Sequence, residues 1–214
     1  MVCPDDATVF FLQHGYNFTM YKNRTLDKDE FKGKRMEGEK FEGCRFGGIS
    51  LRFAEFSRCD FSACDFSGCS FDQTWFSRCN FPECKLSNQD FREVEFEKCD
   101  FRKSVIVNSI FQKFRNSESG ERKKWNLKDC LFSEADLSGT IFVNCILSKV
   151  IFDRSLMERT VFENCDLKEA NFSGADISGT SFEKSTLSGV VLDIDGFIKF
   201  GNSKGFVLSP ETEA

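Results

Sequence analysis

The sequence predicts a solenoid, a rod whose chain turns a corner every five residues. Three observations support this prediction: a large apolar residue returns at every fifth position, a small residue usually stands two places before it, and phenylalanine is unusually abundant. A period of five fits neither an α-helix, with its period of about 3.6 residues, nor a flat strand, with its period of two. An internal repeat of this kind decides the fold class before any local feature is considered.

The repeat extends through most of the chain. Its first run of large apolar residues comprises Phe41, Phe46, Leu51, Phe56, Phe61, Phe66, Phe71, Phe76, Phe81, Leu86, Phe91, Phe96, Phe101, Ile106 and Phe111. After an interruption it resumes, one residue out of phase, at Leu127, Phe132, Leu137, Phe142, Leu147, Phe152, Met157, Phe162, Leu167, Phe172, Ile177, Phe182, Leu187 and Leu192. A weaker lead-in shares the first phase, at Leu26, Phe31 and Met36. We therefore expect one solenoid in two blocks, residues 26–111 and 127–192.

Each repeat also has a preferred composition: a small residue, then Asp or Asn, a large apolar residue, a polar residue and often Gly. Two segments show it most clearly, Ala135–Asp136–Leu137–Ser138–Gly139 and Ala175–Asp176–Ile177–Ser178–Gly179. This pattern resembles that of pentapeptide-repeat proteins. The resemblance implies an all-β fold, a right-handed quadrilateral β-helix with four pentapeptides in each coil, and the repeats of this chain would make about eight coils.

The phenylalanine content predicts what fills the rod. The chain has 27 Phe against 2 Tyr and 2 Trp. Phenylalanine rings need no hydrogen-bond partner, so they suit a narrow, dry interior. In the second block every other large residue is Phe, at Phe132, Phe142, Phe152, Phe162, Phe172 and Phe182. With four repeats in each coil, two opposite walls would carry phenylalanine ladders and the other two would carry aliphatic ladders.

The 11 cysteines follow the repeat as well. Ten of them occupy the small position, namely Cys44, Cys59, Cys64, Cys69, Cys79, Cys84, Cys99, Cys130, Cys145 and Cys165, and Cys3 lies outside it. A buried free cysteine behaves as a small hydrophobic residue, so we expect inert thiols in a reducing compartment and no disulfides. The sequence has no CxxC pair and a single histidine, His14, so we expect no metal site and no cofactor.

Charge is distributed unevenly along the chain, whose formal net charge is −5. Residues 127–214 hold 8 basic and 14 acidic side chains, whereas residues 1–126 hold 21 and 20. We expect an acidic face on the second block, formed by Asp136, Asp153, Glu163, Asp166, Asp176 and Glu183. Such a balance argues against direct binding to nucleic acid and permits contact with a basic, DNA-binding protein surface. A merely solvated surface is the alternative.

The repeat is interrupted between Phe111 and Leu127, where an eleven-residue insertion plus one ordinary repeat restores the phase. We expect an inserted loop at residues 112–126. Basic and aromatic side chains cluster there, at Lys113, Phe114, Arg115, Arg122, Lys123, Lys124 and Trp125. Insertions in solenoids become loops on one face and often mark the binding face, so these residues are candidate partner contacts. An insertion without a role is the alternative.

The two ends depart from the repeat. A solenoid exposes its apolar end unless something covers it. Residues 1–25 contain enough apolar side chains to form an N-terminal cap or an added edge strand, and a partner-binding arm is the alternative. Residues 193–214 would close the C-terminal end or form a contact between two copies of the chain, and the sequence leaves both open.

Several functional classes find no support in the sequence. There is no nucleophile elbow, phosphate-binding loop or metal cluster, so we expect no catalytic residues and no enzymatic activity. The N-terminus lacks the basic start and long apolar stretch of a signal peptide, and nothing approaches the length of a membrane span. We expect a cytoplasmic protein without a membrane partner.

Within the pentapeptide-repeat proteins, the chain resembles the Qnr, MfpA and AlbG group. The likeness lies in its size, in phenylalanine-rich repeats with Cys in the small position, and in a single loop in mid-chain. It implies a protein similar in width and charge to a DNA rod that binds DNA gyrase or topoisomerase IV and protects it from inhibitors. The alternative is a rigid scaffold or effector module with a different protein partner.

Overall fold

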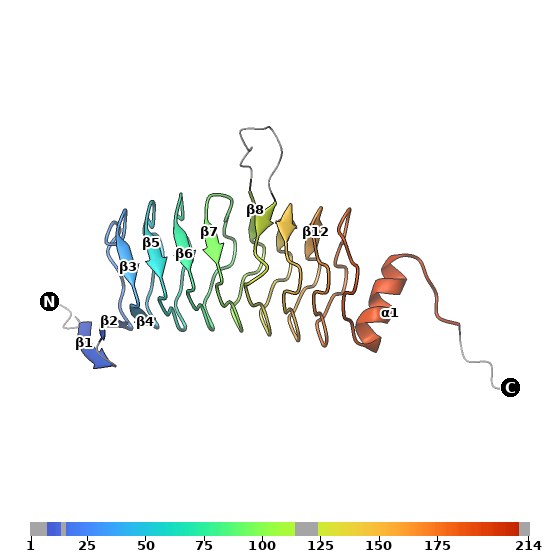
Figure 1. The fold of residues 1–214 in the computed structure, drawn as a ribbon, viewed down its shortest axis with the longest axis horizontal. Coiled ribbons are helices and arrows are strands. Elements are labelled where there is room, and N and C mark those ends of the chain that lie inside the picture. The colour runs from blue at the N-terminus through green and yellow to red at the C-terminus, as the bar shows by residue number, and fades with distance from the viewer. Residues whose placement is uncertain (1–7, 14–15, 114–123, 210–214) are drawn as a thin grey trace.

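The chain forms a right-handed quadrilateral β-helix, shown by a computed structural model that describes residues 8–13, 16–113 and 124–209. Figure 1 shows the coils stacked along one axis, with β1 and β2 at the N-terminal end and α1 at the other end. The solenoid has about 7 turns, close to the eight predicted. The all-β fold class is thus confirmed, with one helix added at the C-terminus.

The strands are short because the chain turns after each repeat. In order they are β1 (Thr8–Gln13), β2 (Tyr16–Lys22), β3 (Arg35–Glu37), β4 (Lys40–Glu42), β5 (Glu55–Ser57), β6 (Trp75–Ser77), β7 (Glu95–Glu97), β8 (Ile110–Gln112), β9 (Trp125–Asn126), β10 (Ile141–Val143), β11 (Cys145–Ile146) and β12 (Val161–Glu163). They pair in parallel in the orders β3-β5-β6-β7, β8-β10-β12 and β9-β11. The other walls of the coils are joined by isolated parallel bridges.

The register shows how the insertion is accommodated. Before it, paired residues are twenty positions apart, as Asp60 and Asn80 are. Across it, Asp100 pairs with Leu131 and Val105 with Asp136, an offset of thirty-one. The difference is the eleven residues predicted from the phase of the repeat. The coils on both sides therefore continue the same four walls.

The chain turns a corner at the second residue after each large apolar residue. Arg58, Ala63 and Gly68 occupy this position in successive repeats, with φ of 55°, 53° and 71°. Only glycine enters this left-handed region without a steric penalty, which explains why glycine is frequent at the end of the repeat. The repetition of this conformation at most of these positions turns the chain by one wall at each step.

The Asp or Asn before each large residue stabilises the adjoining corner. Asp65 accepts a hydrogen bond from the backbone N–H of Ser67 at 2.9 Å, and Asn171 accepts one from Ser173 at 2.9 Å. Asp and Asn commonly bond to the backbone two residues later in this way. The same bond is made by Asp60, Asp90, Asp100, Asn126, Asp136, Asp166 and Asp176. These side chains therefore serve the fold at many points along the rod.

The small inward residues connect neighbouring coils. The Thr160 hydroxyl donates to the carbonyl of Leu137 at 2.8 Å, and the Cys79 thiol donates to that of Phe56 at 3.4 Å. A buried carbonyl is thus given a partner from the next coil, which explains the preference for Cys, Ser and Thr in this position. All ten cysteines in the repeat are free and buried, as predicted. Burial raises the pKa of Cys130 to about 12, so that this thiol is inert.

Stacked aromatic rings fill the interior. One ladder runs through Tyr21, Phe41, Phe61, Phe81, Phe101, Phe132, Phe152 and Phe172, with centroids 4.6–5.4 Å apart. On the opposite wall of the second block, Phe142 stacks on Phe162 at 5.0 Å and Phe162 on Phe182 at 5.5 Å. The two ladders meet edge to face, as between Phe142 and Phe152 at 6.3 Å. The predicted pair of opposite phenylalanine ladders is confirmed.

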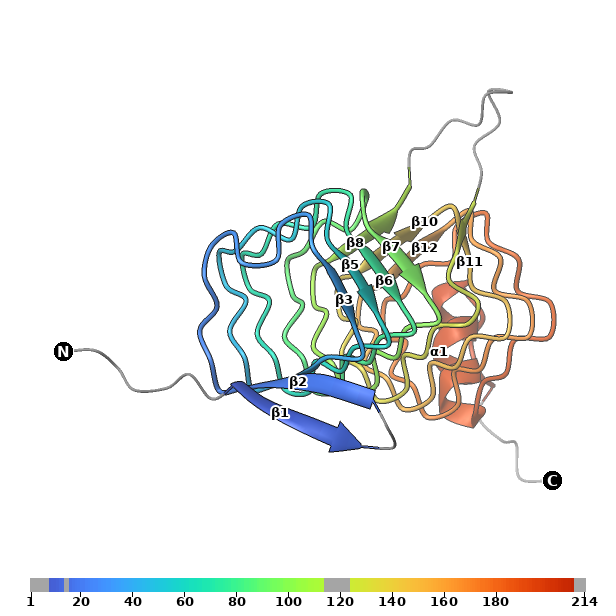
Figure 2. The ribbon, with the colours of Figure 1, turned by 60° about the vertical axis from the view of Figure 1, so that its left-hand side comes forward.

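A hairpin lies at the N-terminal end. Strands β1 and β2 are antiparallel, and β2 pairs in parallel with β4 of the first coil. Tyr21 of β2 stacks on Phe41 at 4.6 Å and so begins the longest ladder. Figure 2 shows the hairpin lying beside the first coils at the end of the rod opposite to α1. This geometry covers the apolar end of the first coil.

Helix α1 (Ile194–Ser203) lies at the other end and was missed by the all-β prediction. Phe200 meets Phe182 edge to face at 5.8 Å, so the helix covers the end of the second ladder. Lys199 forms an ion pair with Asp176 at 3.1 Å. Asp193 accepts from the backbone N–H of Gly196 at 2.7 Å, as a helix N-cap, and from that of Gly174 at 2.8 Å. Within residues 16–113 and 124–209, no helix has the length and apolar character needed to cross a membrane.

The N-cap makes the attachment of α1 sensitive to acid. The two backbone N–H groups, that of Gly196 first, lower the pKa of Asp193 below its ordinary value. The ionised Asp193 carboxylate therefore stabilises the folded state fully above the pKa of about 4 that it has in the unfolded chain. This stabilisation is lost as the pH falls through the lowered pKa of the folded state. We expect Asp193→Asn to lower the melting temperature by a few degrees at neutral pH and to have no effect in strong acid. Thermal unfolding at both pH values checks this, and an equal effect at both would contradict it.

Candidate functional site

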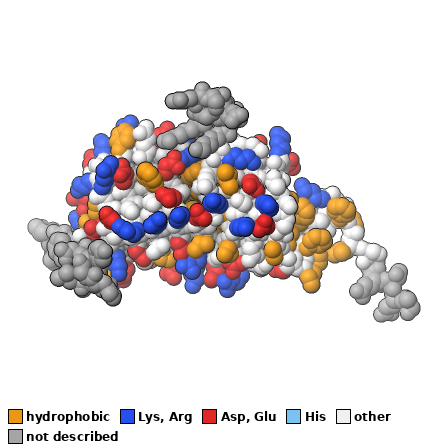
Figure 3. Space-filling model, viewed as in Figure 1, with side chains coloured by type: hydrophobic (Ala, Val, Ile, Leu, Met, Phe, Trp, Pro, Cys, Tyr) orange, Lys and Arg blue, Asp and Glu red, His pale blue; other side chains and the backbone are white. Residues whose placement is uncertain are grey.

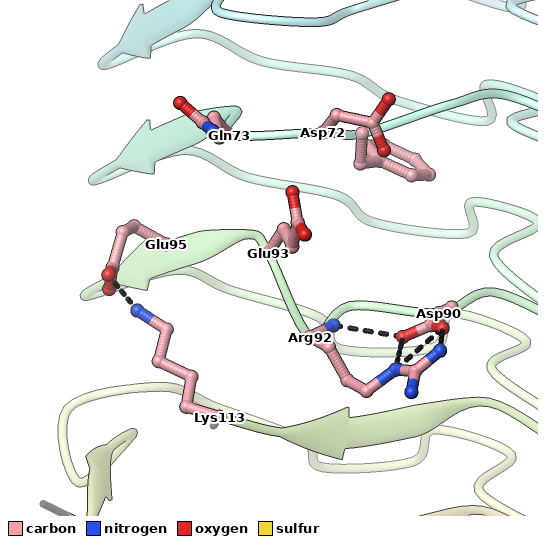
Figure 4. A pocket seen from close by; sticks show the side chains of 8 residues that line it. Asp72, Gln73, Asp90, Arg92, Glu93, Glu95 and Lys113 are labelled. Carbon is pink, nitrogen blue, oxygen red and sulfur yellow. Dashed lines mark hydrogen bonds and ion pairs between the residues drawn. The ribbon is translucent and has the colours of Figure 1, made fainter. Parts of the chain in front are cut away.

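Two adjoining clefts interrupt the wall of the rod near β7. The first, of about 650 Å³, is lined by Phe71, Asp72, Gln73, Asp90, Arg92, Glu93, Glu95 and Lys113. The second, of about 870 Å³, lies between the coils of β7 and β9 and shares Gln73, Glu93, Glu95 and Lys113 with the first. Figure 4 shows that Glu93 points toward the coil of Asp72 and Gln73 and that Arg92 turns to Asp90.

The second cleft exists because the hydrogen-bond ladder stops at β7. At earlier corners, the backbone N–H of Arg58 donates to the carbonyl of Ser77 at 2.9 Å, and the backbone N–H of Arg78 donates to that of Glu97 at 2.7 Å. Lys98, the next corner, has no such bond among the described residues. The ladder resumes on the adjacent wall, where Phe101 donates to Leu131 at 2.8 Å. Strands β7 and β9 therefore end separate sheets and face each other unpaired.

An oversized residue in a small inward position accounts for this break. Trp125 aligns with Cys145, and thus stands where other coils of the same wall have Ala54, Thr74, Val94 and Cys165. Its ring stacks on Phe96 at 6.1 Å and 17°, and only 3% of the residue is exposed. A large ring in a slot built for small residues keeps the two coils apart. Its indole N–H finds no acceptor among the described residues.

The first cleft has a similar cause. Gln89 stands in the small position of a wall that elsewhere has Ile49, Cys69, Ser109 and Thr140. Its amide nitrogen donates to the carbonyls of Ser87 at 3.0 Å and Phe66 at 3.4 Å. In the described wall, bridges join Ser50 to Ser70 and Asp90 to Ile110, and none joins Ser70 to Asp90. Each of the two breaks thus coincides with a long side chain in a small position.

The outer wall above the second cleft carries an exposed tryptophan. Trp75 is 48% exposed and lies in register between Glu55 and Glu95 on the adjacent strands. Glu97 accepts from the Ser77 hydroxyl at 3.2 Å on the same wall. The side of the cleft toward β9 is positive on balance, with Lys124, Lys128 and Asp129 in its lining. The cleft therefore has an acidic, aromatic side and a basic side.

The predicted contact loop is only partly described. Phe114, Arg115, Arg122 and Lys123 lie outside the described residues. Lys113 forms an ion pair with Glu95 and places its ammonium group 5.1 Å from the centre of the Trp125 ring. Lys124 lines the second cleft beside it.

The prediction for Trp125 needs correction. It was expected in the loop of residues 112–126, but it is a buried member of β9, and Gln112 belongs to β8. In the sequence Trp125 stands next to polar residues, which suggested a loop. In the structure its indole ring fills the space beneath Phe96 and is therefore part of the core.

The predicted acidic face also needs correction. Its six carboxylates, Asp136, Asp153, Glu163, Asp166, Asp176 and Glu183, lie on four different walls, because positions five residues apart in the chain are separated by a corner. Asp136 and Asp176 share a column but are separated by Leu156. Figure 3 shows acidic and basic side chains interleaved along the visible wall.

Several of these carboxylates are already engaged. Asp176 accepts from the backbone N–H and hydroxyl of Ser178, at 3.1 and 2.6 Å, and binds Lys199. The Ser178 hydroxyl and backbone N–H, followed by Lys199, lower the pKa of Asp176. The pKa of Asp153 is lowered by a hydrogen bond from the Ser133 side chain and then by Arg154. These carboxylates stabilise corners and ends of the rod while contributing negative charge to its surface.

Sequence reasoning missed most of the cleft. It noted Trp75 as a possible exposed contact, and the structure shows it exposed. It did not single out Gln73, Glu93 or Glu95, because these residues occupy ordinary outward positions of the repeat. It also did not single out Gln89. Gln89 did carry a signal, since a long amide stands where the repeat prefers a small residue. Within the described part of the chain, no group of three or more His, Cys, Asp or Glu side chains is arranged to hold a metal ion.

Comparison with known proteins agrees with this architecture. The model for pentapeptide repeats matches residues 40–76 and 69–106, and that for a pentapeptide repeat region matches residues 124–193. No curated protein sequence matches the chain. The chain belongs to the pentapeptide-repeat family.

Two solved structures of one protein show the same fold. QnrB1, described as a plasmid-mediated fluoroquinolone resistance protein, superposes in one trypsin-treated form with a TM-score of 0.64 at 20% identity, over 89% of this chain and 99% of that one. A second trypsin-treated form of QnrB1 gives 0.54 at 15% identity, over 89% and 97%. The pentapeptide repeat protein Rfr23 from the cyanobacterium Cyanothece 51142 gives 0.48 at 18% identity, over 56% and 88%.

Proposed function

We propose that this protein binds DNA gyrase or topoisomerase IV, without being an enzyme itself, and protects the topoisomerase from quinolones or related inhibitors. The observation that carries the proposal is the match to QnrB1, which extends over 99% of that chain with a TM-score of 0.64. The match supports a shared shape, and the described role of QnrB1 in fluoroquinolone resistance supplies the function. The cytoplasm, where topoisomerases act on DNA, is the compartment that this proposal requires.

The physical basis is a rigid rod with charged walls. A topoisomerase binds DNA on a basic surface, and a negatively charged rod gains affinity for that surface by releasing counterions, as DNA does. The acidic excess of residues 127–214 favours this contact and disfavours direct binding of the rod to nucleic acid. Because the carboxylates are spread over four walls, the rod would present moderate negative charge from any side, with no single acidic stripe.

A gyrase supercoiling assay in the presence of a fluoroquinolone tests the proposal. We expect micromolar protein to restore supercoiling at drug concentrations that otherwise inhibit it, because the rod competes for or reshapes the DNA-binding surface. The same assay with topoisomerase IV and decatenation extends the test. Unchanged drug sensitivity with both enzymes would reject the proposal and favour a rigid scaffold for another protein.

A loop variant separates the contribution of the insertion from that of the rod. Residues 114–123 would be replaced by a short glycine-serine linker, and Lys113 would be kept because it contacts Glu95 and Trp125. If the loop contacts the topoisomerase, protection disappears while the β-rich circular dichroism spectrum stays unchanged. A linker variant that still protects would assign binding to the walls of the rod.

We also propose that two copies of the chain associate through the C-terminal end. While Phe200 faces the last coil, Ile194 and Phe197 of α1 are 82% and 67% exposed. The segment after the helix adds Phe206, Val207 and Leu208, which are 65–90% exposed. Figure 3 shows hydrophobic side chains gathered at this end. Monomeric proteins rarely expose so much apolar surface in one place, and a second copy would cover it.

A further inference from the structure

We propose that the cleft between β7 and β9 is a binding site for an extended, arginine-bearing segment of another protein, held by backbone pairing along β7. This inference goes beyond the proposed function, because it rests on the cleft alone and holds whichever protein supplies the segment.

The backbone of the cleft is prepared for an added strand. Within the described residues the backbone N–H of Lys98 makes no bond to a backbone carbonyl of the following coil, whereas those of Arg58 and Arg78 do so at the equivalent corners. Strand β7 ends its four-stranded sheet, and β9 ends a separate two-stranded sheet. An open edge of this kind is the usual acceptor for an extended peptide, whose main-chain groups complete the ladder.

A buried donor next to this edge points to a ligand as well. Trp125 lines the cleft, and only 3% of its surface is exposed. Its indole N–H, which is a donor only, has no acceptor among the described residues. Leaving a buried donor unpaired is costly, and most buried donors in proteins have a partner. A carbonyl oxygen of an added strand would provide the missing acceptor.

The side chains of the acidic side select the chemistry of the segment. Trp75 is 48% exposed and lies between Glu55 and Glu95 in register, with Glu97 one strand position from its own neighbour Ser77. A guanidinium group stacks on an indole face and pairs with carboxylates at the same time, which an ammonium group does less well. Glu93, exposed at the lip shared by both clefts, adds further negative charge.

The opposite side limits how basic the segment can be. Toward β9 the cleft is lined by Lys124, Lys128 and Asp129, so this side is positive on balance and repels cations on that edge of the segment. A segment with arginines directed to Trp75 and uncharged residues directed to β9 fits both sides. A uniformly basic peptide fits only the acidic side of the cleft. This asymmetry distinguishes the proposed site from general attraction between opposite charges.

Nuclear magnetic resonance gives a direct test, because the chain has only 2 tryptophans and therefore two indole N–H signals. The probe is a short peptide of alternating arginine and threonine. We expect the indole signal of Trp125, identified by its loss in Trp125→Phe, to move downfield as the N–H acquires an acceptor, together with the backbone amide of Lys98. Saturable binding that leaves both signals unmoved would overturn the proposal.

Affinity measurements by fluorescence anisotropy test the two halves of the mechanism. Methylating alternate backbone nitrogens of the peptide should abolish binding, because the ladder bonds are lost. Trp75→Ala should weaken binding about ten-fold, whereas Leu156→Ala should leave it unchanged. Leu156 is the matched control, since it occupies the same repeat position on a distant coil and is 52% exposed.

Three results would overturn the inference. The methylated peptide would bind as well as the unmodified one if backbone pairing were absent. Equal losses for Trp75→Ala and Leu156→Ala would show that the tryptophan is not the contact. Equal or tighter binding of polylysine would show that charge alone attracts the probe. Circular dichroism of each variant confirms that the coil is intact.

Discussion

Replacing Phe61 with alanine is expected to reduce the free energy of unfolding by about 4 kcal/mol. Phe61 is fully buried near the centre of the longest ladder. Its ring stacks between Phe41, at 4.9 Å, and Phe81, at 5.0 Å, and meets Phe56 edge to face at 5.4 Å. Alanine would leave a cavity that the rigid coils cannot close, since hydrogen bonds on both sides hold them at a fixed spacing.

The effect should extend beyond the site. In a solenoid each coil contacts only its neighbours, so stability is a sum of coil and interface contributions. A cavity at Phe61 weakens the interfaces with the coils above and below it. Urea denaturation followed by circular dichroism and by native-state hydrogen exchange measures both the loss and its spread. We expect exchange to increase most in the coils that contain Phe41 and Phe81.

A matched control is available on the surface of the same rod. Phe53 is 46% exposed, and its ring lies beneath the Arg52 guanidinium at 4.7 Å. Phe53→Ala should change the free energy of unfolding by about 0.5 kcal/mol or less, as is usual for exposed sites. Similar losses for the two alanine variants would show that ring stacking contributes little to this fold.

Replacing Phe197 with glutamate is expected to convert the proposed dimer into monomers. Phe197 is 67% exposed on α1, whereas Phe200, three residues later, packs against Phe182 of the last coil. An aromatic residue at the centre of an apolar interface typically contributes 2 kcal/mol or more, and a charge in its place must also be desolvated. The dissociation constant should therefore rise by roughly 30-fold or more.

Analytical ultracentrifugation over a range of concentrations measures this effect. Val105→Glu is the control, because Val105 is an apolar residue, 40% exposed, in the first block of coils and therefore far from α1. The control should remain dimeric, and both variants should keep the wild-type circular dichroism spectrum. A wild-type protein that stays monomeric at every concentration would reject the proposed dimer, and loss of the dimer in both variants would move the contact elsewhere.

The framework of the rod could be predicted because it depends on a local rule repeated many times. Phe56, Phe61 and Phe66 point inward for the same reason, and their spacing defines the turn of the coil at every step. The small residues two places earlier, such as Cys59 and Cys64, were assigned to the interior by the same rule, and they are buried. Even the eleven-residue insertion could be measured, since the phase of the repeat shifts across it.

The ends of the rod were harder to predict because the rule stops there. The segment after Leu192 carries helix signals, with Asp193 as an N-cap and apolar residues at Ile194, Phe197 and Ile198. The decaying repeat concealed them. Which face of this segment is buried depends on the last coil, where Phe182 offers a ring edge for Phe200.

The candidate site depended on contacts between residues far apart in the chain. Trp125 reads as part of a basic loop, but its role follows from the space beneath Phe96, which comes from the preceding coil. Likewise, the acidic residues of the second block form a list in the sequence and four separate columns on the rod, because each repeat turns to another wall.

The sequence of this protein thus specified its coil, its interior and the place of its insertion, since each follows from a period of five that every repeat obeys. Only the tertiary structure decided where the wall opens. A long side chain in a small position, as at Gln89 or Trp125, has no visible consequence until the neighbouring coil is stacked on it. The clefts arise from that conflict between the local rule and the fixed spacing of the coils.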